Sequence, residues 1–247
     1  MAEPFSAQLK ASTATIHDEV EHTSFMVDLM EGRLDVRAYS LLLTQYALIY
    51  AALESKTREF ADSPLVAPFH NSALFRTNRI HSDLEKLGAS AARQRPNAAP
   101  QALGDSGSTV TASAETYADH LNRLTRPEQL IAHHYTRYLG DLSGGQAIGA
   151  LMGRHYSVPA DALTMWDFTK VGKTKPYKDA YRSRLDEIGA NGGDEQLVID
   201  ETLTAFALNG RLLAELSSGA EAPADAAAAT TAGATTATTD AATTANI

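Results

Sequence analysis

A run of residues from about 128 to 155 combines a helical pattern with many glycines. Its apolar residues recur at helix-like spacings, at Leu130, Ile131, Tyr138, Leu142, Ile148, Leu151 and Met152. Each glycine destabilises a helix interior by about 1 kcal/mol relative to alanine, and the run contains Gly140, Gly144, Gly145, Gly149 and Gly153. Because a residue without a Cβ allows close approach to the backbone, a flat apolar ligand pressed against this helix would offset that cost.

Two of these glycines share one face of the predicted helix. Gly140 and Gly144 lie one turn apart on that face. Asp141 lies one turn from both Arg137 and Gly145, so a carboxylate borders a strip of bare backbone. Small residues at this spacing also allow close helix crossing or a bend, and the pattern alone leaves both interpretations open.

The complete string resembles a known signature. Residues 134–146 read His-Tyr-Thr-Arg-Tyr-Leu-Gly-Asp-Leu-Ser-Gly-Gly-Gln, and this closely resembles the signature of the heme oxygenases. The resemblance implies one all-α domain over residues 1–218, with heme sandwiched between a proximal and a distal helix. It also implies oxygen-dependent cleavage of heme to biliverdin, carbon monoxide and ferrous iron. Heme b would be both cofactor and substrate, and a separate reductase or ferredoxin would supply electrons. Heme degradation and iron acquisition would be the purpose.

The same resemblance assigns catalytic roles to residues of the distal side. Asp141 would organise the water through which protons arrive, with Arg137 and Tyr50 in support. The bare backbone of Gly140 and Gly144 would press the oxygen towards the ring. Tyr50, within residues 48–54, resembles a tyrosine of the family's distal hydrogen-bond network, although a core tyrosine fits the position too.

Residues 4–22 predict one amphipathic helix with an apolar stripe of Phe5, Leu9, Ile16 and Val20. Residues 9–17, followed by Glu21, are similar to the family's proximal helix, whose histidine is the axial ligand of the heme iron. His17 is therefore the expected metal ligand, with Glu21 beside the cofactor. A neutral imidazole suits iron and leaves the opposite axial position free for oxygen. Without the resemblance, a packed or solvated histidine would be the default interpretation.

Lys10 lies two turns before His17, about 10 Å along the helix axis, which matches the reach to a propionate of the porphyrin. An ordinary solvated lysine fits the position equally well. Family members often carry a second lysine one turn before the histidine, where this chain has Ala14. That contact is either missing or supplied from elsewhere.

A basic cluster within this acidic protein comprises Lys170, Lys173, Lys175, Lys178, Arg182 and Arg184. Most charge runs are solvated faces, which is the alternative here. Lys178 and Arg182, one turn apart, resemble the family's propionate-binding pair, and Tyr135 resembles a tyrosine that also hydrogen-bonds a propionate. Gly145 is expected beside the cofactor. Phe206 matches a position that packs against heme, although a core phenylalanine fits as well.

The rest of the chain also predicts helices. Periodicity indicates helices over residues 36–61, 71–87, 109–124 and 194–216, with a loop over residues 88–107 and a break at residues 156–159. Residues 219–247 are mainly alanine and threonine, so we expect a disordered tail there.

Composition limits the function further. The chain has 247 residues, 44% of them hydrophobic, which is enough for a sizeable core. It has no cysteine, which excludes disulfides, thiolate ligation of iron and Fe–S clusters. A net charge of −9 argues against general nucleic-acid binding. Since we find neither a signal core nor a membrane-length apolar run, we expect a cytoplasmic monomer without a membrane anchor.

Three alternatives remain open from the sequence. A heme carrier or sensor could use the same histidine pocket without catalysis. A carboxylate-bridged dimetal enzyme needs two Glu-x-x-His pairs, and only Glu19 with His22 forms one. A relative with the same fold could act on another small molecule, as thiamine-degrading proteins do. The neighbouring His133 and His134 point about 100° apart on a helix and are poorly placed to share one metal ion.

Overall fold

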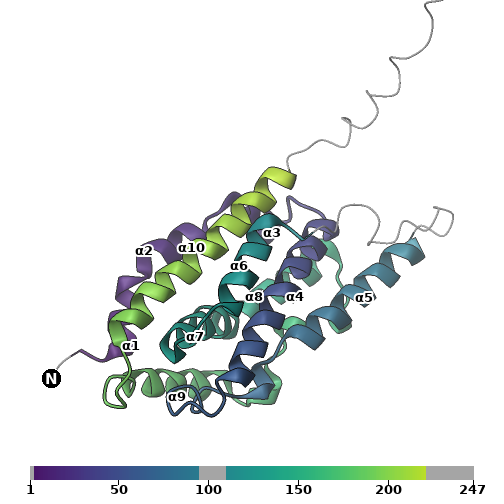
Figure 1. The fold of residues 1–247 in the computed structure, drawn as a ribbon. Helices are drawn as coiled ribbons and strands as arrows, with labels where there is room; N and C mark the ends of the chain where they lie inside the picture. The colour runs from purple at the N-terminus through teal and green to yellow at the C-terminus, as the bar shows by residue number, and fades with distance from the viewer. Residues whose placement is uncertain (1–2, 95–109, 221–247) are drawn as a thin grey trace, which may run out of the picture.

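The structure is a computed structural model that describes residues 3–94 and 110–220 (Figure 1). Every regular element in these ranges is helical, which confirms the predicted all-α class. The α-helices are α1 (Phe5–Ser12), α2 (Ala14–Glu21), α3 (Ser24–Met30), α4 (Val36–Glu59), α5 (Thr77–Gln94), α6 (Ala112–Asn122), α7 (Pro127–His134), α8 (Gly140–Tyr156), α9 (Thr174–Asp186) and α10 (Glu195–Ala220). The short elements are η1 (Ser72–Leu74), the π-helical η2 (Tyr135–Leu139), η3 (Ala160–Ala162), η4 (Thr164–Trp166) and η5 (Thr169–Val171).

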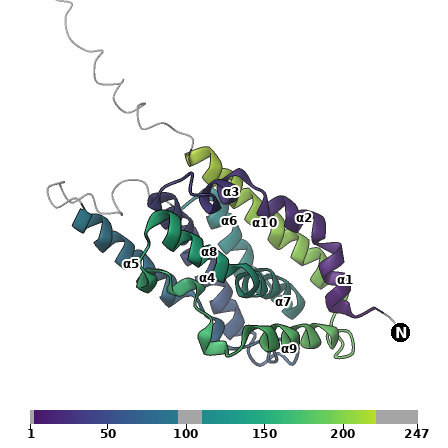
Figure 2. The same cartoon turned by 180° about the vertical axis from the view of Figure 1, so that it is seen from behind.

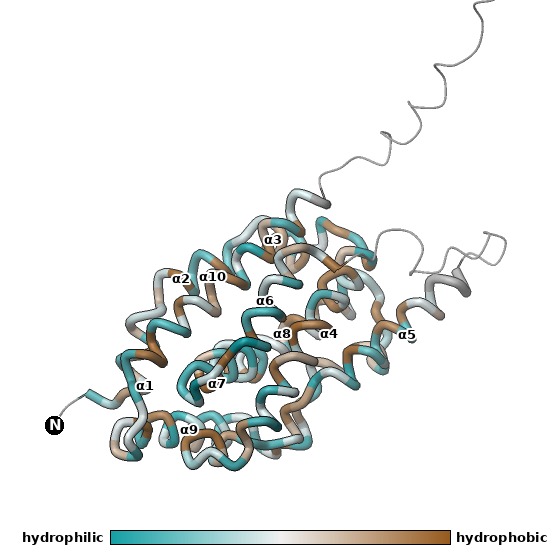
Figure 3. Tube along the Cα trace, in the orientation of Figure 1, coloured by the Kyte–Doolittle hydropathy of each residue, from teal (hydrophilic) through white to brown (hydrophobic). Residues whose placement is uncertain are grey.

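Helix α4 forms the centre of the core and contacts α5, α6 and α7. It begins at Val36 because the Asp35 carboxylate caps it, accepting hydrogen bonds from the backbone N–H groups of Arg37 and Ala38. Its buried face carries Tyr39, Leu42, Leu43, Tyr46, Ile49, Tyr50 and Leu53. Burying each large apolar side chain contributes about 1.5–3 kcal/mol. In Figure 3, hydrophilic and hydrophobic stretches alternate along α2, α4 and α10, as amphipathic helices require.

Helix α10 runs beside α2, as Figures 1 and 2 both show. It also contacts α3, α6 and α7, while α1 contacts α9 near the N-terminus. Residues of α10 therefore reach both the N-terminal helices and the helix that precedes the glycine-rich segment.

The single helix predicted over residues 4–22 is in fact two helices, α1 and α2, which meet at Thr13. The Thr13 hydroxyl donates a hydrogen bond to the carbonyl of Leu9 at 2.9 Å, and its backbone angles (φ −107°, ψ 1°) depart from helical values. Threonine that bonds back in this way bends helices. Phe5 and Leu9 of α1 are buried, whereas no residue of α2 is fully buried.

The glycine-rich run is one helical segment interrupted by a single π turn. Pro127 opens α7, where its missing N–H is tolerated. The π turn η2 inserts an extra residue before α8, and such turns are frequent at functional sites. Helix α8 ends at Tyr156 and is followed by Ser157 in a left-handed conformation (φ 53°), which confirms the predicted break.

Helices α5 and α10 end later in the structure than the sequence predicts. Helix α5 continues to Gln94, so the loop expected from residue 88 is wrong over residues 88–94, where alanines favour the helix. Residues 95–107 of that loop lie outside the described residues. Helix α10 extends two residues into the expected tail, and residues 221–247 are likewise outside the described part. No helix in the described ranges is long and apolar enough to cross a membrane.

Candidate functional site

The two glycines at the start of α8 face open space. A Cβ built on Gly140 or on Gly144 would meet no atom within 4 Å. Gly140 is exposed and Gly144 is half-buried. The backbone here is therefore left bare, as a ligand that lies flat against it would require. We call the backbone of these two residues the open strip.

Gly145 lies on a different face of α8 and does not belong to the open strip. A Cβ on Gly145 would come within 2.8 Å of the Trp166 ring, and one on Gly149 within 3.3 Å of the same indole. Trp166 is fixed because its Nε1–H donates to the Tyr39 hydroxyl at 2.9 Å. This glycine allows close packing of α8 against η4, and its place beside the cofactor stays a prediction.

His17 presents a half-exposed imidazole on α2. Its side chain is 49% exposed, and its Nε2 lies 3.5 Å from Glu21 Oε1 one turn later. A carboxylate that engages one ring nitrogen fixes the ring and raises the basicity of the other nitrogen. Glu21 is therefore placed to orient the His17 ring, and the role of His17 as an iron ligand stays a prediction.

Three predicted distal residues meet in a buried network. The Tyr50 hydroxyl donates a short hydrogen bond to Asp141 Oδ2, and Arg137 Nε donates to the same hydroxyl at 3.3 Å. The Arg137 guanidinium also stacks over Tyr46, 4.2 Å from the ring centroid. Tyr50 is fully buried, whereas Asp141 keeps 9% of its surface exposed. The π turn thus brings Arg137 inwards, next to the carboxylate that borders the open strip.

Helix α10 links this network to His17. The Phe206 ring lies edge-on to the His17 ring, with centroids 5.5 Å apart. One turn later, Asn209 Oδ1 accepts a hydrogen bond from Arg137 Nη1 at 3.0 Å. The proximal and distal candidate residues therefore contact neighbouring turns of the same helix.

Helix α9 delivers two basic residues to the glycine-rich segment. Lys178 Nζ donates to Ser143 Oγ on α8 at 3.3 Å. Burial raises the pKa of Tyr135 on η2, while the charge of Arg182 and a hydrogen bond with Thr13 act against that rise. Lys178 thus lies next to α8, and the charge of Arg182 acts on Tyr135 of η2.

Two basic side chains near the contact of α1 with α9, Lys10 and Arg182, are exposed. Lys10 is exposed in the last turn of α1, the helix that contacts α9. Arg182 is exposed and lies 3.2 Å from Asp179, so its charge is partly balanced at the surface. Both side chains are therefore accessible to an anionic group that binds near α1 and α9.

Comparison with known proteins decides the family. Residues 3–215 match the family model described as "Heme oxygenase". This chain belongs to the heme oxygenase family. The heme oxygenase of Takifugu rubripes is 32% identical over 215 residues, covering 85% of this chain and 73% of that protein. Heme oxygenase 1 of Synechocystis sp. is 26% identical over 218 residues, covering 87% and 86% respectively. The crystal structure of the Synechocystis heme oxygenase-1, described as a complex with heme, superposes with a TM-score of 0.73 and covers 88% of this chain and 94% of that one.

Two partners of the distal network in this heme oxygenase chain were not predicted from the sequence. Asn209 lies one turn after Phe206 and is a polar residue on a buried face of α10. Tyr46 lies one turn before Tyr50 on α4. Their spacing is a signal that the sequence contains, since Asn209 is three residues after Phe206 and Tyr46 is four residues before Tyr50. Only the fold shows that Arg137 contacts both Asn209 and Tyr46.

The buried carboxylate predicts a pH-dependent stability. Burial raises the pKa of Asp141, although Arg137 and the Tyr50 hydrogen bond act to lower it. Because the folded state then holds the proton more tightly than the unfolded state, Asp141 stabilises the fold below about pH 4 and loses that contribution as pH rises. Asp141→Asn should therefore be more stable than wild type at pH 7, with a smaller difference at pH 5. Urea unfolding at both pH values measures this; a difference that grows towards pH 5 would contradict it.

Proposed function

We propose that this chain cleaves heme with molecular oxygen to biliverdin, carbon monoxide and ferrous iron. The observation that carries the proposal is the open strip of Gly140 and Gly144, bordered by the carboxylate of Asp141. Electrons would come from a separate reductase or ferredoxin, because a chain without cysteine holds no Fe–S cluster of its own.

The residues present fit heme as the ligand. His17 offers an imidazole, a ligand that suits heme iron, and the open strip admits a flat ring against the backbone. Lys178, Arg182 and Tyr135 offer charge-assisted and neutral hydrogen bonds to the propionates, and Lys10 lies within reach of the same edge. Phe206 would pack against the ring beside His17. When bound, heme supplies both the iron that activates oxygen and the ring carbon that is oxidised.

Asp141 is the proposed acid–base residue. Among the described residues, Tyr50 gives the only hydrogen bond to its carboxylate, so the second oxygen can hold a water molecule at the open strip. Burial keeps the pKa of this carboxyl above its ordinary value, which favours proton exchange with that water. Arg137 and Asn209 hold the carboxylate and Tyr50 in place. The bare backbone of Gly140 and Gly144 confines the space above the ring.

A single-turnover experiment tests the function. The hemin complex is mixed with a reductant and oxygen, and the products are separated and identified. We expect one biliverdin and one carbon monoxide for each heme consumed. A Soret band that persists under these conditions would refute the enzyme and favour a carrier or sensor of heme.

Neighbouring glycines of α8 should respond in opposite ways to the same substitution. Gly144→Ala adds a methyl group to open space, so the free energy of unfolding should stay equal or rise by up to about 1 kcal/mol. Hemin affinity should nevertheless fall, because the methyl group occupies the proposed ring position. Gly145→Ala should lower the free energy of unfolding by about 1–3 kcal/mol, since its Cβ would clash with Trp166.

Urea unfolding and hemin titration of the two variants check this pair of predictions. Hemin that binds Gly144→Ala as tightly as wild type would place the ligand elsewhere on the protein.

A further inference from the structure

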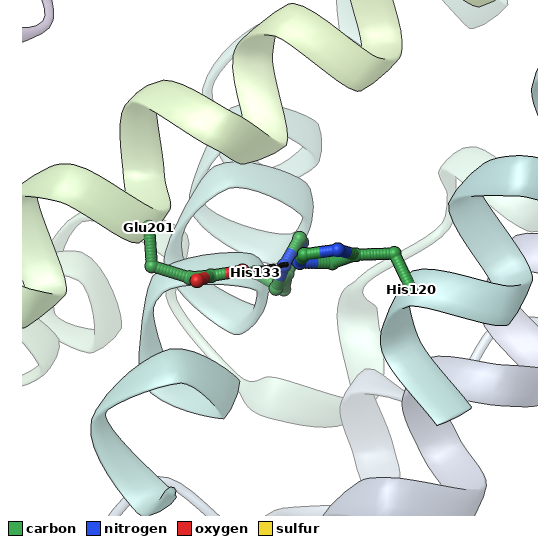
Figure 4. Close-up of side chains that lie close together, drawn as sticks. All are labelled: His120, His133 and Glu201. Carbon is green, nitrogen blue, oxygen red and sulfur yellow. Dashed lines mark hydrogen bonds and ion pairs between the residues drawn. The ribbon is translucent and has the colours of Figure 1, made fainter. Parts of the chain in front are cut away.

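A second cluster of ionisable side chains lies outside the proposed heme site. His120 of α6, His133 of α7 and Glu201 of α10 point towards one another (Figure 4). Glu201 Oε1 lies 2.5 Å from His120 Nε2 and 2.9 Å from His133 Nε2. The three donor atoms all lie within 4.8 Å of one another. We propose that this cluster binds a divalent first-row transition metal ion, represented by Zn²⁺.

The donor set matches that ion class. Two imidazole nitrogens and one carboxylate oxygen are ligands that Zn²⁺ takes at about 2.0–2.2 Å. Tetrahedral ligands at that distance are about 3.3 Å apart. The two nitrogen–oxygen separations would therefore have to widen by less than about 1 Å, which small side-chain rotations provide. A water molecule would complete the four ligands.

Outer partners already orient two of the three ligands. The Tyr117 hydroxyl lies 3.2 Å from His133 Nδ1, and Gln129 Nε2 donates to Glu201 Oε2 at 3.2 Å. Metal binding through Nε2 places the His133 proton on Nδ1, where it donates to Tyr117. Metal-bound histidines usually make such a second hydrogen bond, and ligating carboxylates are usually held in the same way.

Burial also fits a metal ion. His133 is fully buried, whereas the His120 side chain is 33% exposed and leaves the cluster open to solvent on one side. Both imidazoles make their hydrogen bonds to the same carboxylate oxygen, Glu201 Oε1, so an ion at this point would replace those two hydrogen bonds.

The bound ion would brace the helices that support the distal network. It would join α6, α7 and α10 at one point. Helix α7 leads directly into η2, which carries Arg137, and α10 carries Asn209, its hydrogen-bond partner. The site would therefore contribute to stability.

Equilibrium dialysis of the full, tag-free chain against zinc chloride tests the proposal. We expect one zinc per chain in the wild type. Glu201→Gln should retain less than a tenth of it, and His120→Ala should bind at least 10-fold more weakly. At a zinc concentration of about 100 times Kd, the Tm of the wild type should rise by about 5 °C, and that rise should be lost in both variants.

Two control variants should retain zinc like the wild type. His81→Ala changes an exposed histidine of α5, and His17→Ala removes the half-exposed histidine of α2. If Glu201→Gln does not fold, His120→Ala at its partly exposed position gives the same comparison. Zinc retained equally by these cluster variants, or no zinc in the wild type, would overturn the proposal and leave a hydrogen-bonded cluster only.

Discussion

Asp141→Asn is expected to bind hemin like the wild type and to form biliverdin at least about 100-fold more slowly, the scale of a lost acid–base residue. The amide keeps the size of the carboxyl group and can still accept the hydrogen bond that Tyr50 donates. It cannot exchange a proton at neutral pH. The loss should therefore appear in the rate of product formation and not in hemin affinity.

Two further variants sharpen this prediction. Tyr50→Phe removes only the hydroxyl that holds Asp141 and should slow product formation less than Asp141→Asn does. Asp200→Asn changes an exposed carboxylate of α10 and should have no effect. Biliverdin yields are measured by single turnover with equal amounts of bound hemin. Undiminished turnover by Asp141→Asn would remove this residue from the mechanism.

His17→Ala is expected to remove the axial imidazole, with a changed spectrum of the ferric hemin complex and loss of nearly all product. The ring is half-exposed on a helix with no fully buried residue, so the variant should fold normally. Glu21→Gln, which alters the orienting partner alone, should lower hemin affinity or activity by about 10–100-fold.

Added imidazole provides the decisive control for His17. It should restore the spectrum of the His17→Ala complex, because the small ligand can enter the space that the side chain leaves. His22→Ala, at the exposed end of the same helix, should behave like the wild type. An unchanged ferric spectrum in His17→Ala would rule out this histidine as the ligand.

Local spacing predicted those parts of the site that lie on single helices. Gly140, Gly144 and Asp141 share the first turns of α8, and Lys178 and Arg182 share one turn of α9. Such relations follow from the geometry of a helix alone. The family resemblance then indicated the fold that brings these helices together, and the match to the Synechocystis heme oxygenase-1 structure confirms that fold.

The features that sequence reasoning missed depend on partners distant in the chain. Gly145 differs from Gly144 only because Trp166 packs against it. Asn209 joins the network through Arg137, 72 residues away. The bend at Thr13 depends on a hydrogen bond from the Thr13 hydroxyl to the carbonyl of Leu9. The spacing of apolar residues carries no information about such a hydrogen bond.

We propose that heme lies between the His17 imidazole and the backbone of Gly140 and Gly144, and a crystal structure of the hemin complex would decide this. We predict iron bonded to a ring nitrogen of His17, with the porphyrin in contact with the open strip and its propionates at Lys178 and Arg182. Hemin bound elsewhere, or side chains that fill the space beside Gly140 and Gly144, would contradict this position of the heme.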